Sequence, residues 1–199
     1  MSAIKTTLSD FNSINQIAAF NGLSADELQK IKGLLRQKTF AAGATLMMVE
    51  QTGEAVYFIA SGTVKIHVEQ ADGADVIISI LGPGEIIGEM DLLDNRGRSA
   101  SVVTLEPCAM LWMDRASFRQ CLQDIPQITF NLACILAARL RLANAQIQAL
   151  VALDTECRVA REILAFSERY GQKQSNGDIS IPIRLTQSDI ASMVGATRE

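Results

Sequence analysis

Residues 84–101 read GEIIGEMDLLDNRGRSAS and bring a carboxylate and a guanidinium into one glycine-rich segment. Gly88 lets the backbone approach a ligand closely, because glycine has no Cβ. Glu89 offers oxygens that accept hydrogen bonds from sugar hydroxyls. Nine residues later, Arg98 presents a planar fork of donors that suits a phosphate, and Ser99 adds a hydroxyl and an N–H. This combination describes a site for a nucleotide monophosphate.

Two other roles are possible for this segment: a dinucleotide-binding loop and a loop held by an ion pair. The glycine pattern over residues 82–88 resembles a dinucleotide-binding loop, but Pro83 and the flanking β-type sequence do not open a long helix after a strand. That interpretation is therefore excluded. The second is an ion pair from Arg98 to Glu89 or Asp94 that only holds a loop, and the residues alone favour neither this pair nor phosphate binding.

The segment lies in a β-rich region between Phe40 and Met113. Short apolar and β-branched pieces alternate there with glycine turns, and Asp72-Gly73 is a strong hairpin signal. Short strands at intervals of about ten residues are typical of a β-sandwich or barrel. The strands predicted from this pattern cover residues 45–49, 55–60, 62–69, 75–81, 99–105 and 109–114.

Helical sequences flank the β-rich region. Apolar residues recur at spacings of three and four over residues 9–37, where Ser24 and Glu27 form a capping-box signal. Residues 127–153 contain neither Gly nor Pro and predict one helix of about 40 Å. Because this helix is apolar over most of its circumference, we expect it to pack against a copy of itself, with burial inside one chain as the alternative. Another helix is predicted over residues 155–170.

The C-terminal segment, residues 185–199, reads LTQSDIASMVGATRE and has the layout of a helix-turn-helix. Thr186 is a helix cap with Asp189 as its partner three residues later, and Gly195 supplies a turn. Thr197 is then the N-cap of a second helix that begins at Arg198. The second helix of such a motif enters the major groove of DNA. A plain helical hairpin is the alternative.

Composition restricts the remaining classes of protein. Apolar residues make up 48 % of the chain and charged residues 20 %, which excludes a disordered chain. The net charge of −4 divides into −5 for residues 1–124 and +1 for residues 125–199. The first part therefore repels nucleic acid, whereas the second part does not.

Four scattered cysteines and the lack of a signal peptide indicate a cytoplasmic protein with reduced thiols. No apolar run approaches the roughly 18 residues of a membrane span, and the single His67 leaves little scope for a metal site or catalysis. We therefore expect no membrane, no metal and no enzymatic activity.

The order of these elements resembles the CRP/FNR family of bacterial transcription regulators over nearly the whole chain. The resemblance implies an α+β fold with N-terminal helices, an antiparallel β-roll like a double-stranded jelly roll, a long dimerisation helix and a truncated C-terminal winged helix-turn-helix. It divides the chain into an effector domain similar to cyclic-nucleotide-binding domains (residues 1–124), a dimerisation helix (125–153) and the first part of a DNA-binding domain (154–199).

The glycine-glutamate and arginine-serine-alanine motifs are similar to the phosphate-binding cassette of cyclic-nucleotide-binding domains. By this resemblance Glu89 holds the ribose 2′-hydroxyl, and Arg98 holds the cyclic phosphate. The two base-contacting positions on the long helix fall at Ala143 and Asn144. The ligand-binding residues implied in this way are Ser79, Gly88, Glu89, Met90, Arg98, Ser99 and Asn144. The implied effector is cyclic AMP or a similar cyclic nucleotide, and no other cofactor is required.

The helix-turn-helix resembles that of the same family, in which an Arg and a Glu at the start of the recognition helix contact base edges. Those positions are Arg198, which would donate to guanine, and Glu199, which would accept from cytosine. Phosphate contacts are implied for Thr186, Gln187, Ser188 and Thr197. Because the chain ends two residues into this helix, we expect these 199 residues to bind DNA poorly or not at all.

The resulting hypothesis is a homodimeric transcription regulator that binds double-stranded DNA when full-length, with RNA polymerase as a further partner. Two alternatives stay open. One is a regulator of the same fold with a degenerate pocket or another small-metabolite effector. The other is a nucleotide-binding regulatory subunit that acts on a partner protein.

Overall fold

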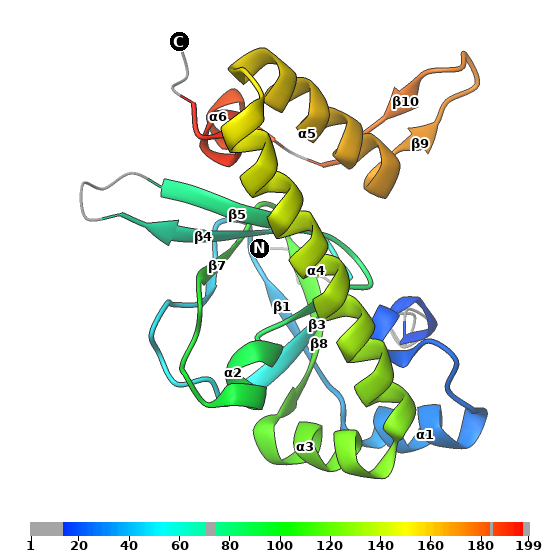
Figure 1. The fold of residues 1–199 in the computed structure, drawn as a ribbon. Helices are drawn as coiled ribbons and strands as arrows, with labels where there is room; N and C mark the ends of the chain where they lie inside the picture. The colour runs from blue at the N-terminus through cyan, green and yellow to red at the C-terminus, as the bar shows by residue number, and fades with distance from the viewer. Residues whose placement is uncertain (1–13, 71–74, 184, 197–199) are drawn as a thin grey trace.

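The computed structural model describes residues 14–70, 75–183 and 185–196. Two four-stranded antiparallel sheets form a roll, and helices cover one side of it (Figure 1). The strand orders are β1-β8-β3-β6 and β2-β7-β4-β5. In chain order the strands are β1 (Arg36–Phe40), β2 (Thr45–Met47), β3 (Ala55–Ser61), β4 (Val64–Glu69), β5 (Asp75–Leu81), β6 (Ile86–Ile87), β7 (Ser101–Thr104) and β8 (Cys108–Asp114). This arrangement confirms the α+β class and the antiparallel β-roll.

Two apolar clusters hold the roll together. The first lies between the sheets, where Ile59, Val64 and Met110 are fully buried. The second joins the outer face of the first sheet to the helices, with Phe58 and Phe118 among its buried members. Strand β3 contributes to both clusters, which explains its nearly continuous apolar sequence AVYFIAS.

The helices predicted within residues 9–37 are only partly confirmed. Residues 9–13 lie outside the described residues, Ala18–Phe20 form a 3-10 turn (η2), and the α-helix α1 covers only Ala25–Leu34. Its capping box is present as expected, since the Glu27 carboxylate accepts from the Ser24 backbone N–H at 2.8 Å. Residues 36–37 are not helical, because the segment RQKTF pairs along its whole length with β8.

The predicted hairpin at residues 72–73 lies outside the described residues, but the strands on either side of it, β4 and β5, do pair in antiparallel fashion. A short helix α2 (Glu89–Asp94) follows β6, and α3 (Arg115–Asp124) follows β8.

The long helix α4 spans Pro126–Ala152, within one residue of its expected bounds. Its N-terminal half packs on η2, where the Asn131 amide donates to the Ala19 carbonyl at 3.0 Å. Further along, large apolar side chains stay exposed, including Leu140, Ile147 and Val151 at 62 %, 60 % and 86 %. By length and composition alone α4 could cross a membrane, so the expected absence of a membrane partner remains a prediction.

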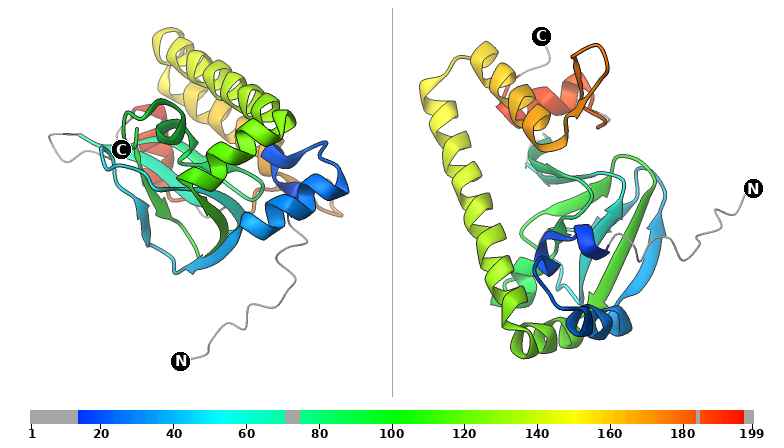
Figure 2. Two further views of the ribbon diagram at one scale, coloured as in Figure 1. Left: turned by 90° about the horizontal axis from the view of Figure 1, so that it is seen from below. Right: turned by 90° about the vertical axis from the view of Figure 1, so that its right-hand side faces the viewer.

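The C-terminal elements fold back over one end of the roll (Figure 2). They are α5 (Thr155–Tyr170), the hairpin of β9 (Gln172–Lys173) and β10 (Ile179–Ser180), and α6 (Gln187–Val194). Helix α6 has the predicted capping box between Thr186 and Asp189, and Gly195 ends it in the left-handed conformation with φ +63°. A third apolar cluster packs Ile77 and Ile80 of β5 against Phe166 of α5 and Met193 of α6. The predicted second helix, which begins at Arg198 after the N-cap Thr197, lies outside the described residues.

Candidate functional site

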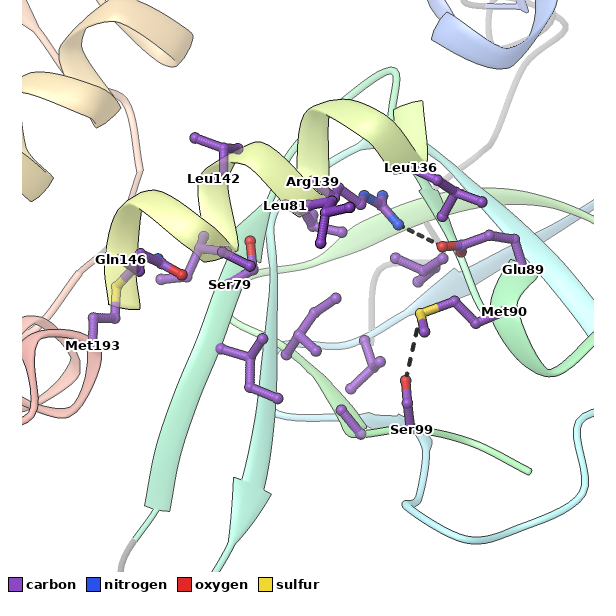
Figure 3. Close-up of a pocket in the computed structure, with 18 of the residues that line it drawn as sticks. Ser79, Leu81, Glu89, Met90, Ser99, Leu136, Arg139, Leu142, Gln146 and Met193 are labelled. Carbon is purple, nitrogen blue, oxygen red and sulfur yellow. Dashed lines mark hydrogen bonds and ion pairs between the residues drawn. The ribbon is translucent and has the colours of Figure 1, made fainter. Parts of the chain in front are cut away.

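A cavity of about 710 Å³ lies between the β-roll and helices α4 and α5 (Figure 3). Its volume is within the range of small-molecule sites, about 300–1,000 Å³. The sequence segment GEIIGEMDLLDNRGRSAS supplies one wall, and six of the seven predicted ligand-binding residues line the cavity: Ser79, Gly88, Glu89, Met90, Arg98 and Ser99.

Gly88 makes the turn between β6 and α2, with φ +79°. The Arg98 guanidinium packs directly against it, so that a Cβ at this position would overlap Arg98 Nη1. Both the left-handed backbone and the close approach of the arginine therefore require glycine here.

Arg98 is a buried cation on the cavity wall, with 8 % of its surface exposed. Its Nη1 donates to the Gly88 carbonyl at 2.6 Å, and its Nη2 donates to the Ala55 carbonyl at 2.7 Å. Burial lowers the pKa of the guanidinium, and the nearby carboxylate of Asp91 opposes that change. A guanidinium has five N–H donors, and the described residues accept from two of those of Arg98.

Glu89 is 2 % exposed and receives a charge-assisted hydrogen bond from α4. Arg139 Nη1 donates to Glu89 Oε1 at 2.6 Å, while Arg139 Nη2 donates to the Ile86 carbonyl at 2.6 Å. Among the described residues, no other side chain donates to this carboxylate, which leaves Oε2 as an acceptor for a ligand hydroxyl. Arg139 was not identified from the sequence, although a cation in an otherwise apolar stretch of helix was a signal for it.

The alternative ion pairs of Arg98 are absent from the described residues. Glu89 is paired with Arg139, and the Asp94 carboxylate accepts from the Arg96 backbone N–H at 3.1 Å. The interpretation in which Arg98 only holds a loop through one of these two carboxylates is therefore wrong. The carboxylate beside Arg98 is Asp91, which pairs with Arg115 at 3.2 Å.

The other predicted contacts divide into two groups. Ser79 on β5 faces the cavity, and the Ser99 hydroxyl donates to Met90 Sδ at 3.8 Å on the cavity wall (Figure 3). Asn144 does not line the cavity and is exposed. Its neighbour Ala143 does line it, because one residue turns a helix by about 100°. Gln146 of α4 is an unpredicted polar group on the same wall.

The far wall of the cavity comes from the C-terminal elements, namely Arg161, Glu162 and Phe166 of α5 and Met193 of α6. Burial raises the pKa of Glu162. Two further contacts join α5 to the turn before β6: Arg169 pairs with Glu85, and the Tyr170 hydroxyl lies 3.0 Å from Glu85 Oε2.

Three residues predicted to contact DNA lie exposed at the start of α6. They are Thr186, Gln187 and Ser188. Thr197, Arg198 and Glu199 lie outside the described residues, so their predicted contacts stay predictions.

Comparison with known proteins identifies a matching domain and similar relatives. Residues 37–124 match the cyclic nucleotide-binding domain. The chain is 33 % identical, over 90 % of its length and 80 % of the relative, to the CRP-like cAMP-activated global transcriptional regulator of Mycobacterium tuberculosis. It is 29 % identical, over the same shares, to the cyclic AMP receptor protein of Thermus thermophilus.

The fold is also similar to that of the c-di-GMP responsive global regulator CLP of Xanthomonas campestris, with a TM-score of 0.73 and 22 % identity over 88 % of this chain and 86 % of that one. The identity of 33 % over most of both chains, the matched nucleotide-binding domain and the shared fold lead to one conclusion: the chain belongs to the CRP/FNR family of bacterial transcription regulators.

Proposed function

We propose that this effector-gated transcription regulator binds cyclic AMP, or a closely similar cyclic nucleotide, in the cavity between the β-roll and α4. Arg98 contacts the cyclic phosphate, with Ser99 beside it, and Glu89 accepts from the ribose hydroxyl. The observation that carries the proposal is the buried Arg98 on the cavity wall, with a buried carboxylate on the same loop. The matched nucleotide-binding domain and the names of the relatives support the same ligand class.

The purine lies toward Ser79 and the wall that α4 and α5 form. Gln146 and Ala143 line this part of the cavity, and of the two only the Gln146 side chain can both donate and accept. Gly88 and Met90 border the sugar and phosphate. Asn144 faces away from this cavity, on the side of α4 that a second chain would cover.

Two sets of contacts transmit the signal, because they join the cavity to helices α4 and α5. Arg139 connects Glu89 to α4, so a ribose hydroxyl that binds to Glu89 changes the surroundings of that arginine. Tyr170 and Arg169 connect α5 to the β5–β6 turn that leads into the phosphate loop. The ligand regulates by binding one arrangement of these elements more tightly than another, since equal affinity for both shifts nothing.

The exposed apolar face of α4 packs against the same helix of a second chain, which gives a homodimer. Its two helix-turn-helix units contact successive major grooves of double-stranded DNA, as the family implies. Thr186, Gln187, Ser188 and Thr197 hold phosphates, and Arg198 and Glu199 contact bases. RNA polymerase is the protein partner that an activator of this kind recruits.

This role places the chain in the bacterial cytoplasm, as a binding protein and not an enzyme. We propose the same three-part division, with boundaries at residues 124 and 153.

Calorimetric titration with cyclic AMP, cyclic GMP and cyclic di-GMP tests the ligand assignment. Arg98→Ala is expected to abolish nucleotide binding. Arg96→Ala is the matched control, because Arg96 lies two residues away on the same loop and is exposed. A saturating ligand at about 100 times its Kd adds about 2.7 kcal/mol to the free energy of unfolding, so thermal melting provides a second measurement.

Unchanged affinity in a folded Arg98→Ala variant, or no binding of any cyclic nucleotide to the unmodified protein, would contradict the proposal. The second result favours a regulator with a degenerate pocket or a different metabolite.

A further inference from the structure

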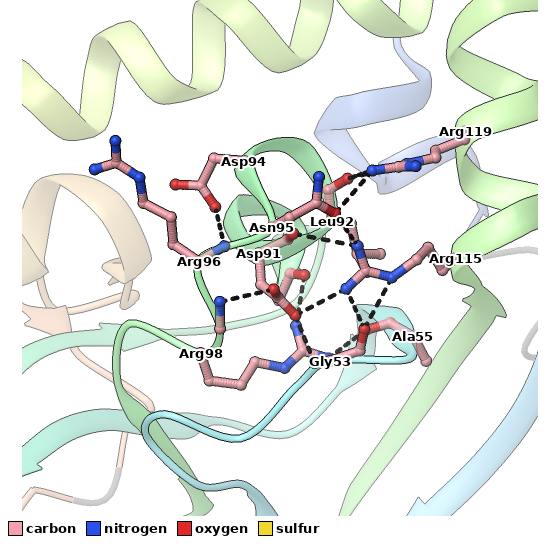
Figure 4. Close-up of polar contacts among 12 residues, drawn as sticks. Gly53, Ala55, Asp91, Leu92, Asp94, Asn95, Arg96, Arg98, Arg115 and Arg119 are labelled. Atoms are coloured by element: carbon pink, nitrogen blue, oxygen red, sulfur yellow. Dashed lines mark hydrogen bonds and ion pairs between the residues drawn. The ribbon is translucent and has the colours of Figure 1, made fainter.

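Three charged side chains converge on Gly53, in the loop before β3 (Figure 4). Arg115 Nη2 donates to the Asp91 carboxylate at 3.2 Å and to the Gly53 carbonyl at 2.6 Å. Arg98 approaches the same glycine from the cavity side: a Cβ at Gly53 would lie under 3.0 Å from both Arg98 Cζ and Asp91 Oδ2. The carboxylate of Asp91 therefore lies between two guanidinium groups.

The Asp91 carboxylate is 2 % exposed and is held in the ionised form by its surroundings. Its Oδ2 accepts from the Gly53 backbone N–H at 2.5 Å, and its Oδ1 accepts from the Gly97 backbone N–H at 3.0 Å. These bonds and the two arginines keep the pKa of Asp91 below its ordinary value in spite of burial. The charge at this position is thus fixed near neutral pH.

The charges around the phosphate position can be counted from these contacts. Arg98, Arg115 and Asp91 together carry one net positive charge, and the pair of Glu89 with Arg139 is neutral. Arg98 and Asp91 line the cavity, whereas Arg115 lies behind Asp91 and away from it. The far wall adds two arginines and two glutamates, whose charges cancel: Arg161, Arg169, Glu162 and Glu168. The charged groups of the phosphate site and the cavity wall therefore sum to one positive charge.

The two natural classes of adenosine phosphate differ in charge at neutral pH. A cyclic phosphodiester carries one negative charge, as each phosphate of DNA does. A terminal phosphomonoester carries about −1.5 to −2. One net positive charge neutralises the first and leaves the second with an unpaired negative charge beside buried groups, which is unfavourable.

We propose that Asp91 determines specificity: by setting the charge of the phosphate site to +1, it makes the site select a monoanionic cyclic phosphodiester over a dianionic phosphomonoester. This inference rests on the proposed function, because it takes Arg98 as the phosphate ligand. Arg115 is the positioning residue that holds the carboxylate in place.

The test compares the Kd values of cyclic AMP and 5′-AMP at about pH 7.5, measured by calorimetry. In Asp91→Asn the site gains one positive charge, so the preference for cyclic AMP is expected to fall by about tenfold or more, equivalent to about 1.4 kcal/mol. In Arg115→Gln the site loses one positive charge, so 5′-AMP binding weakens more than cyclic AMP binding and the preference rises. The double variant restores the charge and, with it, the original preference.

Asp94→Asn is the matched control, because it removes an exposed carboxylate from the end of the same short helix. Its preference is expected to equal that of the unmodified protein. A third ligand, the monoanionic methyl ester of 5′-AMP, tests the charge argument in the unmodified protein and needs no variant to fold. It should bind about tenfold more tightly than 5′-AMP itself.

Each outcome separates the two proposals. If the unmodified protein binds no adenosine phosphate, the proposed function fails and this inference fails with it. If cyclic AMP binds, but the preference is the same in Asp91→Asn as in the control, Asp91 has only a structural role and the inference alone is overturned. The inference is also overturned if the methyl ester binds no better than 5′-AMP, whether or not the variants fold.

Discussion

Gly53→Ala is expected to damage the phosphate site, even though it adds only one methyl group. The added Cβ would lie under 3.0 Å from Arg98 Cζ, Arg98 Nη2 and Asp91 Oδ2. These atoms cannot withdraw freely, because Arg98 is bonded to two carbonyls and Asp91 to two backbone N–H groups. The effect is steric, since φ at Gly53 lies outside the left-handed region.

Forcing a methyl group into a well-packed site costs about 1–3 kcal/mol. For a chain of this size each kcal/mol lowers Tm by about 2–4 °C, so a cost of about 2 kcal/mol predicts a fall of about 4–8 °C. Nucleotide binding is expected to fall as well, because the methyl group displaces the guanidinium that we propose as the phosphate ligand. Thermal unfolding and calorimetric titration, at equal protomer concentration, measure the two effects.

Gly33→Ala is the control, because its Cβ would have no atom within 4 Å and Gly33 lies within α1. Alanine is the better helix former, so this variant should gain about 0.5 kcal/mol or more and bind nucleotide normally. A Gly53→Ala variant that melts and binds like the unmodified protein would refute the description of a tightly packed cluster around Gly53.

Three further results are expected. Tyr170→Phe removes the hydroxyl that lies 3.1 Å from the Ile80 carbonyl and also contacts Glu85. The variant should lose about 1 kcal/mol of unfolding free energy and change the effector concentration that the full-length protein needs for DNA binding. An unchanged effector concentration would show that this contact does not transmit the signal. The pKa of Asp91 is lowered in the folded state, so its contribution to stability is complete above its unfolded pKa of about 3.9 and is lost as the pH falls through its folded pKa. Urea titrations from pH 7 to pH 2 should therefore show a smaller loss of unfolding free energy at acid pH for Asp91→Asn. An equal loss in both proteins would contradict this assignment. The exposed thiol of Cys157 should react with a thiol reagent in the native protein. Cys108 is buried, and burial raises its pKa to about 11, so it should react only after unfolding. Labelling of Cys108 in the native protein would show that the sheet opens.

The regular elements were largely predictable, because their signals are local. The helix α5 has the predicted bounds, and the capping boxes at Ser24 and Thr186 depend on side chains three residues apart. Strand β1 was missed because five residues beside a helix carry too weak a pattern, and only pairing with β8 decides their conformation. The same applies to β6, which has two residues.

Within the site, the sequence predicted the residue types better than their partners. Glu89 and Arg98 belong to one contiguous motif, so both could be identified, but Arg139 lies 50 residues from the carboxylate that it contacts. Asn144 was placed by counting along a helix, which fixes a position but not the direction in which the side chain points.

The class of fold, the order of its elements and the motif that carries Glu89 and Arg98 could be predicted from the residues alone, because turn residues, caps and apolar periodicity act over a few neighbours. Only the tertiary structure decided which charges meet. Asp91 lies between Arg98 and Arg115, and Glu89 faces α4, because the strands and loops that carry these groups converge around Gly53 and Gly88. The strength of an electrostatic interaction depends on distance and burial, and neither quantity exists until the chain has folded.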